Sequence, residues 1–328
     1  MACPFLQDPV DIEAQIIHRT LRRERVIRPR LDMLSFPDEF LLERYRFSSQ
    51  SILYLNNILK PHVSNTTHRG SALTSLQTLC IALRFFANGS FLYSVGDAEH
   101  TGKATVRRSV RKVCLALKQL LYSFVVFPGH KPLMNIKEDS TELIIGCMDG
   151  THIPIKAPAE NEGDYLICYA TNIITNVEAK WPGSVHDARI FRESALYSKF
   201  DQGQYDGILL ADRGYPCMPY VMTPYPDPEP GPQSHYNLAL CRTRARVEMT
   251  IGILKARFQC LRGLRVTPER ACDIIVACVV LHNIATIRRE QHPAIPQIND
   301  EEEPHVDLPE HRNGRIVRNA ICKHHFTD

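Results

Sequence analysis

The sequence predicts an all-α region followed by an α/β region. Between residues 36 and 130, apolar residues recur at helical spacing. From about residue 131, short apolar segments rich in β-branched residues replace them, and one helical segment separates the fourth of these from the fifth. With 328 residues and 44% hydrophobic content, the chain can bury a sizeable core and is long enough for two domains.

The first region has the order of elements that a helix-turn-helix unit shows. The stretch "SLQTLCIALRFFANGS" carries an apolar stripe that stops at Asn88–Gly89, where a helix is expected to end. A short element follows, and then a longer basic helix whose apolar stripe consists of Val106, Val110, Val113, Leu117 and Leu120. A short helix, a turn and a basic helix predict a helix-turn-helix-like DNA-binding domain over residues 36–130.

Two clusters of basic residues stand out, although the net charge is only +3. Residues 18–30 hold six arginines and one glutamate, within an Arg-rich N-terminal arm or helix that we expect over residues 1–35. The predicted basic helix places four cations on its outer side: Arg107, Arg108, Arg111 and Lys112. Such clusters favour nucleic-acid binding. A solvated helix face or a sorting signal is the alternative for either cluster.

The composition excludes several other classes. The eleven cysteines are scattered and form no CxxC pair, which argues against a disulfide framework and a zinc–thiolate site and favours a reducing compartment. The N-terminal residues contain no apolar signal-peptide core, and no uncharged run reaches membrane-spanning length. We therefore expect a soluble intracellular protein with no membrane partner.

The second region, over residues 131–290, reads as strands and helices in a fixed order. Five predicted strands lie in "LIIGCMDG", "HIPIKAP", "DYLICYA", "IITNVEAKW" and "DGILLAD". The Pro-rich residues 222–237 predict an ordered loop. Two helices follow, and the second begins at Thr267 as N-cap with Pro268 at its first position. Residues 291–328 are polar and predict a flexible tail.

Four acidic residues are the candidate functional groups. Asp149 and Asp212 each follow an apolar strand and precede a glycine. Asp187 lies where a strand passes into a helix, and Glu248 lies about 100° from the core stripe of the first long helix. Loops at strand ends are where an α/β sheet collects its functional groups.

Each acid also has a local explanation. Asp187 can cap a helix, Asp149 and Asp212 can close turns with their glycines, and Glu248 can pair with Arg244 four residues earlier. Together, however, these acids would repel one another at one sheet edge unless a cation compensates them. All-carboxylate ligation favours Mg²⁺ or Mn²⁺ over Zn²⁺. Two such ions can stabilise both the attacking and the leaving oxygen of a phosphodiester.

The motifs that carry these acids resemble the Harbinger (PIF/Harbinger) DDE transposases, and more narrowly the nucleases derived from them. The resembling stretches are "CMDGTHIPIKAP", "AKWPGSVHDARIF", "LLADRGYP", "RARVEMTIGILKARFQCLRGL" and "ACVVLHNIA", in the order of the family. The 35 residues between Asp212 and Glu248 match the family's spacing. The resemblance implies an RNase H-like fold, a mixed sheet with flanking helices. It also implies a catalytic triad of Asp149, Asp212 and Glu248, with Asp187 as a further metal-site acid.

The activity implied by this resemblance is metal-dependent DNA cleavage without autonomous transposition. Candidate phosphate-binding cations are Lys156, Arg213 and Lys255, whereas His186 and His282 are expected to be structural. The family also implies DNA and a Myb/SANT-like DNA-binding protein as partners, a homodimer, and a location in nucleus and cytoplasm. The alternative is a DNA-binding or partner-binding protein that keeps the fold but does not cut.

One region departs from the family. The chain is shorter by about one strand between Tyr165 and Leu166. This predicts that residues 164–170 form a stub or a loop, and that the strand of Asp149 pairs with the one over residues 173–181. On this reading the shortened hairpin would weaken the preorganisation of the acids.

Overall fold

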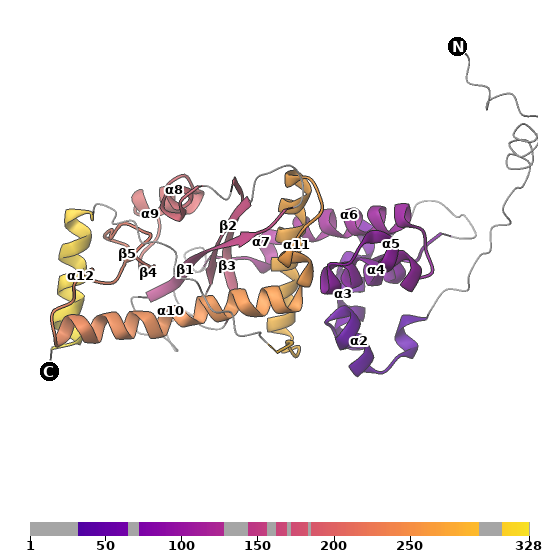
Figure 1. Ribbon diagram of the computed structural model, residues 1–328, viewed down its shortest axis with the longest axis horizontal. Coiled ribbons are helices and arrows are strands. Elements are labelled where there is room, and N and C mark those ends of the chain that lie inside the picture. The colour runs from indigo at the N-terminus through magenta and orange to yellow at the C-terminus, as the bar shows by residue number, and fades with distance from the viewer. Residues whose placement is uncertain are drawn as a thin grey trace, which may run out of the picture. The chain divides into compact units, whose positions relative to one another are not determined.

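A computed structural model describes residues 32–64, 72–127, 144–155, 162–168, 172–182, 185–294 and 310–327; for residues 162–168 and 180–182 it describes the backbone only. Residues Asp32–Asp328 belong to one compact unit. The elements before the sheet are η2 (Met33–Ser35), α2 (Asp38–Tyr45), α3 (Ser49–Val63), α4 (Ser75–Asn88), α5 (Leu92–Ala98), α6 (Lys103–Gln119) and α7 (Leu121–Phe124) (Figure 1). Those of the sheet and beyond are β1 (Ile144–Ile153), β2 (Glu162–Cys168), β3 (Ile174–Pro182), α8 (Asp187–Arg192), α9 (Ala195–Asp201), β4 (Ile208–Leu210), β5 (Val221–Met222), α10 (Pro232–Arg257), η5 (Gln259–Arg262), α11 (Pro268–Ile287) and α12 (Arg312–His325).

The first helices form where the sequence predicts them. Helix α4 begins with a capping box between Thr74 and Gln77 and ends at Gly89, whose φ of 61° is the left-handed conformation that glycine adopts readily. Helices α5 and α6 follow with a short turn between them. Helix α6 buries the predicted apolar stripe from Val106 to Leu117. The predicted order of short helix, turn and basic helix is therefore present.

Helix α11 joins the helical region to the sheet, because it contacts α6, α7 and β3. Asn283 on α11 bonds both the N–H and the carbonyl of Ile174 and also the carbonyl of Phe124. By length and composition α11 could cross a membrane, yet 67% of its most apolar stretch is buried inside the structure. That burial is what a core helix shows.

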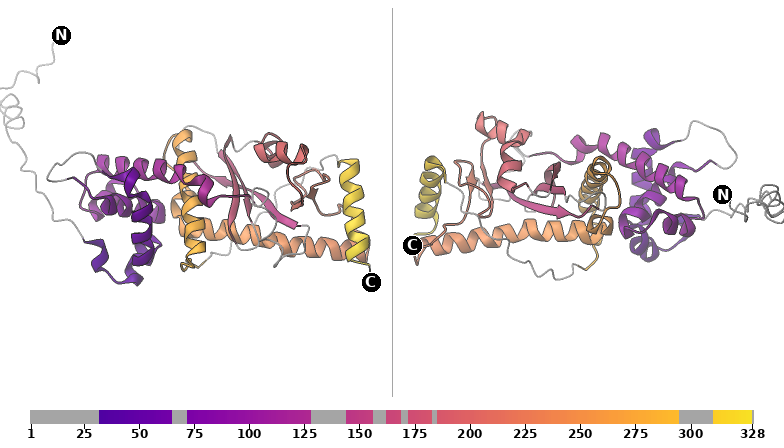
Figure 2. Two further views of the ribbon diagram at one scale, coloured as in Figure 1. Left: turned by 180° about the vertical axis from the view of Figure 1, so that it is seen from behind. Right: turned by 45° about the horizontal axis from the view of Figure 1, so that its top comes forward.

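The sheet has five strands in the order β3-β2-β1-β4-β5. Strand β2 runs antiparallel to both β1 and β3, whereas β4 runs parallel to β1 and to β5. Helices α8 and α9 cover one face and α10 runs along the other (Figures 1 and 2). The core under α8 and α9 includes Met148 from β1, Leu209 from β4 and Phe191 from α8. This is a mixed sheet with flanking helices, as the sequence predicts.

The prediction that residues 164–170 form a stub or a loop is wrong for residues 164–168, and residues 169 and 170 lie outside the described residues. Residues Glu162–Cys168 form β2, which lies between β1 and β3, so Asp149 pairs with Leu166 and not with the 173–181 segment. Two apolar strands with nothing between them would leave a row of N–H and C=O groups unpaired, and seven residues suffice to satisfy both. The shorter hairpin therefore keeps its interior strand.

Two further expectations are corrected. Helix α10 begins at Pro232, so the end of the predicted Pro-rich loop is helical, since proline is tolerated at a first helical position. The predicted flexible tail contains α12, which packs against α10 and β5. Polar composition suggests a solvated tail, but the buried side chains of Arg318 and Cys322 anchor this helix.

Candidate active site

The register between β1 and β4 brings Asp149 and Asp212 together. The two strands run parallel, and Cys147 is the partner of Leu210. Asp149 lies two residues beyond Cys147, and Asp212 lies two residues beyond Leu210. Side chains two residues apart project to the same face of a sheet, so both carboxylates lie on the face that carries Cys147 and Leu210. The sequence placed Asp149 at a strand end, but β1 continues to Ile153. It is the pairing with β4 that ends before Asp149.

Helix α10 supplies the third acid because it covers this face of the sheet. The thiol of Cys147 donates to the carbonyl of Thr243 on α10 at 3.7 Å. Val247 is fully buried and fixes the rotation of the helix, which places Glu248 at the margin of the buried stripe. Glu248 is 48% exposed, compared with 31% for Asp212 and 18% for Asp149, so the site opens towards Glu248.

Arg244 lies between the three acids. Its Nη2 is 3.6 Å from Asp149 Oδ1, 3.7 Å from Asp212 Oδ2 and 3.6 Å from Glu248 Oε1. No two of these oxygens can be farther apart than twice that distance. The structure thus brings the three predicted acids together, and it places a cation among them. From the sequence, Arg244 was expected only as an ion-pair partner of Glu248.

Backbone N–H groups hold the two aspartates in place. The N–H of Gly150 donates to Asp149 Oδ1 at 3.0 Å, and the N–H of Gly214 donates to Asp212 Oδ1 at 2.9 Å. The local turns considered as alternatives are therefore present, and they coexist with the cluster. Hydrogen bonds to a charged carboxylate orient it and lower the cost of its burial.

Asp149 has a strongly shifted pKa. Burial raises the pKa of Asp149 to about 7; Arg244 opposes this, while the neighbouring acids Asp212, Glu248 and Asp187 add to it. The group is thus poised between its neutral and charged forms near neutral pH. A bound divalent cation would favour the charged form.

Asp187 lies at the other face of β1. Its carboxylate occupies the space where a side chain of residue 150 would begin, and residue 150 points away from the face that carries Asp149. Asp187 opens α8, whose N-cap is His186. Asp187 therefore lies next to Asp149 but across the strand backbone from Arg244.

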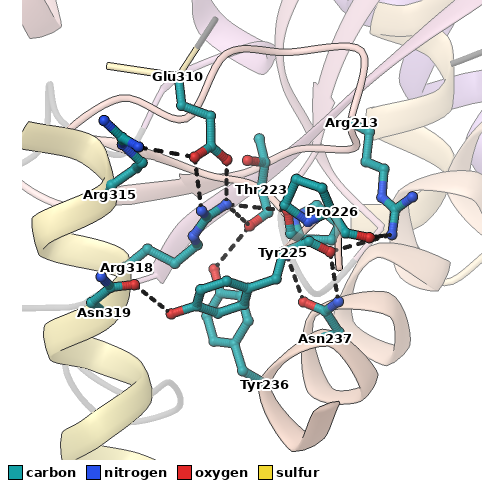
Figure 3. A network of polar contacts seen from close by, with 11 residues as sticks. Arg213, Thr223, Tyr225, Pro226, Tyr236, Asn237, Glu310, Arg315, Arg318 and Asn319 are labelled. Carbon is teal, nitrogen blue, oxygen red and sulfur yellow. Dashed lines mark hydrogen bonds and ion pairs between the residues drawn. The ribbon is translucent and has the colours of Figure 1, made fainter. Parts of the chain in front are cut away.

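The other predicted cations have varied surroundings. Arg213 donates to the carbonyls of Tyr225 and Pro226 at 3.2 and 3.0 Å and so fixes the loop after β5 (Figure 3). Lys255 donates to the carbonyl of His152 at 3.1 Å, near the end of β1. Lys156 lies outside the described residues. Arg213, which follows Asp212 in the chain, therefore already has a structural role.

The predicted DNA-binding residues share one surface of α6. Arg107, Arg108 and Arg111 are exposed, and no described acid forms an ion pair with them. Lys112 is half-buried and donates to the carbonyl of Ser64 at 2.9 Å. Residues 18–30 lie outside the described part of the chain.

The two histidines were expected to be structural. His282 is completely buried and its Nε2 lies 2.9 Å from the carbonyl oxygen of Asn172. Burial lowers the pKa of His282 to about 4, so the imidazole is neutral at physiological pH. This geometry confirms a structural role for His282, whereas His186 precedes Asp187 at the start of α8.

Carboxylates are suitable ligands for a divalent metal ion, but the three carboxylate oxygens lie farther from their common centre than metal ligands do. Mg²⁺ binds oxygen ligands at about 2.0–2.1 Å, whereas the three oxygens lie 3.6–3.7 Å from the cationic nitrogen among them. Within the described ranges, no group of three His, Cys, Asp or Glu side chains is arranged to hold a metal ion. The guanidinium marks a place where a positive charge is stabilised.

The sequence of the chain matches known proteins over the region that carries these acids. A family model described as "DDE superfamily endonuclease" matches residues 148–283, which span Asp149, Asp212 and Glu248. This class implies an RNase H-like fold, in agreement with the mixed sheet, and its members generally use divalent metal ions. No solved structure matches the chain.

Comparison with individual proteins identifies the family within this class of endonucleases. The human protein "Putative nuclease HARBI1" is 32% identical over 317 residues, which cover 90% of this chain and 89% of the human one. A protein of the same name from Bos taurus is 33% identical over 82% of this chain and 81% of its own. "Protein ALP1-like" from Arabidopsis thaliana is 21% identical over 79% and 72%. The chain belongs to the family of nucleases derived from Harbinger transposases.

Proposed function

We propose that this protein hydrolyses DNA phosphodiester bonds with the help of Mg²⁺ or Mn²⁺. The observation that carries the proposal is the meeting of Asp149, Asp212 and Glu248 around one positive charge, from three separate elements. Family membership supports it, because the matching family model is described as "DDE superfamily endonuclease" and the human and Bos taurus relatives carry the name "Putative nuclease HARBI1".

Each acid has a part that follows from its position. Asp149 lies on β1 and Asp212 lies just beyond the end of the neighbouring parallel strand β4, so they would hold the cations from the sheet side of the site. Glu248 would add a carboxylate ligand from α10 at the exposed side of the site, while Asp187 lies at the other face of β1 next to Asp149. Two bound divalent cations supply Lewis-acid stabilisation of the attacking and leaving oxygens. The protein's own contribution is to position the carboxylates within a rigid frame.

The helical region would bind DNA through an exposed basic surface on α6 that consists of Arg107, Arg108 and Arg111. The helix-turn-helix-like reading of residues 36–130 and the separate catalytic domain over 131–290 remain predictions. So do a Myb/SANT-like partner, a homodimer, and a location in nucleus and cytoplasm. The alternative function is a protein that binds DNA or a partner protein without cutting DNA. The argument for it was the expected loss of an interior strand, and β2 forms at that position.

Cleavage of supercoiled plasmid by the purified protein tests the proposal. Nicking should require Mg²⁺ or Mn²⁺, stop with a chelator, and be lost in Asp149→Asn, Asp212→Asn and Glu248→Gln. Glu193→Gln is a matched control, since Glu193 forms an exposed pair with Arg189 on the surface of α8. Cleavage that survives all three active-site changes would contradict the proposal.

A further inference from the structure

Arg244 has unusual surroundings for an arginine in an ion pair. Arginine normally binds a carboxylate through short, paired hydrogen bonds of about 2.7–2.9 Å. Here a single nitrogen lies almost equally far from three carboxylates, at 3.6–3.7 Å, which is beyond hydrogen-bonding distance. The side chain is only 13% exposed, and its Nε is buried with no hydrogen-bond partner in the described structure. Arg244 therefore contributes charge at this site without forming hydrogen bonds to the acids.

The carboxylates need such a charge. Asp149, Asp212 and Glu248 repel one another, and burial of Asp149 makes its ionisation costly. A positive group at nearly equal distance from all three reduces the repulsion without favouring one partner. The position it takes is the one a ligated cation would take, since it faces one oxygen from each of three elements.

We infer that Arg244 is the resident counterion of the metal-free site and that it must leave this position when a divalent cation enters. The inference rests on the proposed function and deepens it. Metal ligation requires each oxygen to move inward by about 1.5 Å, to the 2.0–2.1 Å that Mg²⁺ demands. The guanidinium then stands in the way, and its charge repels the incoming cation. Arg244 is thus a positioning residue that keeps the acids together while it competes with the metal.

The test measures metal affinity without DNA and without cleavage. Binding of Mn²⁺ to the full chain is followed by the loss of the free-ion signal in electron paramagnetic resonance. Arg244→Gln and Arg244→Ala remove the competing charge and should tighten Mn²⁺ binding by about tenfold or more. Arg244→Lys keeps a positive charge and should stay near the wild-type affinity. Arg246→Ala, an exposed arginine on the same helix, is the control and should change nothing.

A purely structural role for Arg244 gives the opposite result. If the residue only held the site in shape, its removal would loosen the acids and weaken Mn²⁺ binding. Unchanged or weaker Mn²⁺ binding in both Arg244→Gln and Arg244→Ala overturns the inference, provided that the circular dichroism spectra of both variants match that of the wild type. If one variant misfolds, the Mn²⁺ affinity of the other decides.

The result also separates this inference from the proposed function. If wild-type protein and all Arg244 variants fail to bind Mn²⁺, the metal site itself is wrong and both proposals fall. If the wild type binds Mn²⁺ and loses it in Asp149→Asn while Arg244→Gln binds no better, the metal site stands and only the counterion role falls. Binding that becomes measurable only in Arg244→Gln supports the inference most directly.

Discussion

The carboxylate of Asp187 fills the space that a side chain at Gly150 would need. A Cβ at Gly150 would come within 2.5 Å of Asp187 Cγ, closer than real Cβ atoms approach any heavy atom. Only glycine at residue 150 therefore lets Asp187 approach β1 beside Asp149. This relationship connects the motif around Asp149 with the motif around Asp187 across the strand.

Gly150→Ala should push the carboxylate of Asp187 away from β1. The atoms in the way are the end of a side chain that can turn aside, so the loss of stability should be small. Because misplacement by about 1 Å can reduce a rate about 100-fold, plasmid cleavage should fall by a similar factor. Chemical denaturation and the nicking assay measure the two effects. Gly263→Ala is the control, since nothing lies within 4 Å of its Cβ position. A Gly150→Ala protein that cleaves plasmid as fast as the wild type would contradict the packing that we describe.

The stability of the metal-free protein should fall as pH rises from about 4 to about 7. The pKa of Asp149 is raised from 3.8 to about 7, so in that range the folded protein keeps a proton that the unfolded chain has lost. Stability that depends on this proton is complete below the unfolded pKa and is lost as pH passes the folded one. Denaturant titrations across this range in the presence of a chelator measure the effect.

Asp149→Asn should flatten this dependence on pH because the amide does not titrate. Saturating Mn²⁺ should raise the stability of the wild type at pH 7 by mass action and leave the variant unchanged. A wild-type protein whose stability does not vary between pH 4 and 7, or a variant that varies as strongly as the wild type, would show that Asp149 is not the titrating group.

Replacement of Arg107, Arg108 and Arg111 by Ala should weaken DNA binding for all sequences alike. Each lost phosphate contact should make the dependence of log K on log salt shallower by roughly 0.9. Lys112→Ala should have a smaller effect, because Lys112 is already bound to the carbonyl of Ser64. Fluorescence anisotropy at several salt concentrations measures this. If affinity in the triple variant equals that of the wild type, α6 does not contact DNA.

Arg318→Ala should detach α12 and destabilise the protein by about 3–5 kcal/mol, the usual cost of removing one partner of a buried ion pair. Arg318 is 3% exposed, binds Glu310 at 2.7 and 3.0 Å, and also donates to the carbonyls of Thr223 and Pro224 (Figure 3). Arg315→Ala is the matched control, because Arg315 is 56% exposed and 4.0 Å from the same glutamate. Equal effects of the two changes on urea denaturation would contradict the anchoring role of Arg318.

The identity of the elements was readable from local sequence patterns. Helix α4 ends at Gly89 and α11 begins after Thr267 because these choices depend on the conformational preferences of a few neighbouring residues. The candidate acids were equally readable, since Asp149 and Asp212 each follow an apolar segment, where an unpaired carboxylate would be costly. The motifs around these acids, together with the spacing from Asp212 to Glu248, then gave the resemblance to the family that the relatives confirm.

The partners of those residues were decided by the tertiary structure alone. Strand β2 forms although its segment looks truncated, because β1 and β3 both need hydrogen bonds that only an interior strand can supply. Helix α12 is held by Arg318, whose carbonyl partners lie 94 and 95 residues away in the chain. Arg244 reaches Asp149 and Asp212 only because the parallel register of β1 and β4 and the rotation of α10 bring them to one face. Such long-range pairing leaves no local signature, since it depends on how whole elements satisfy one another's backbone groups and charges.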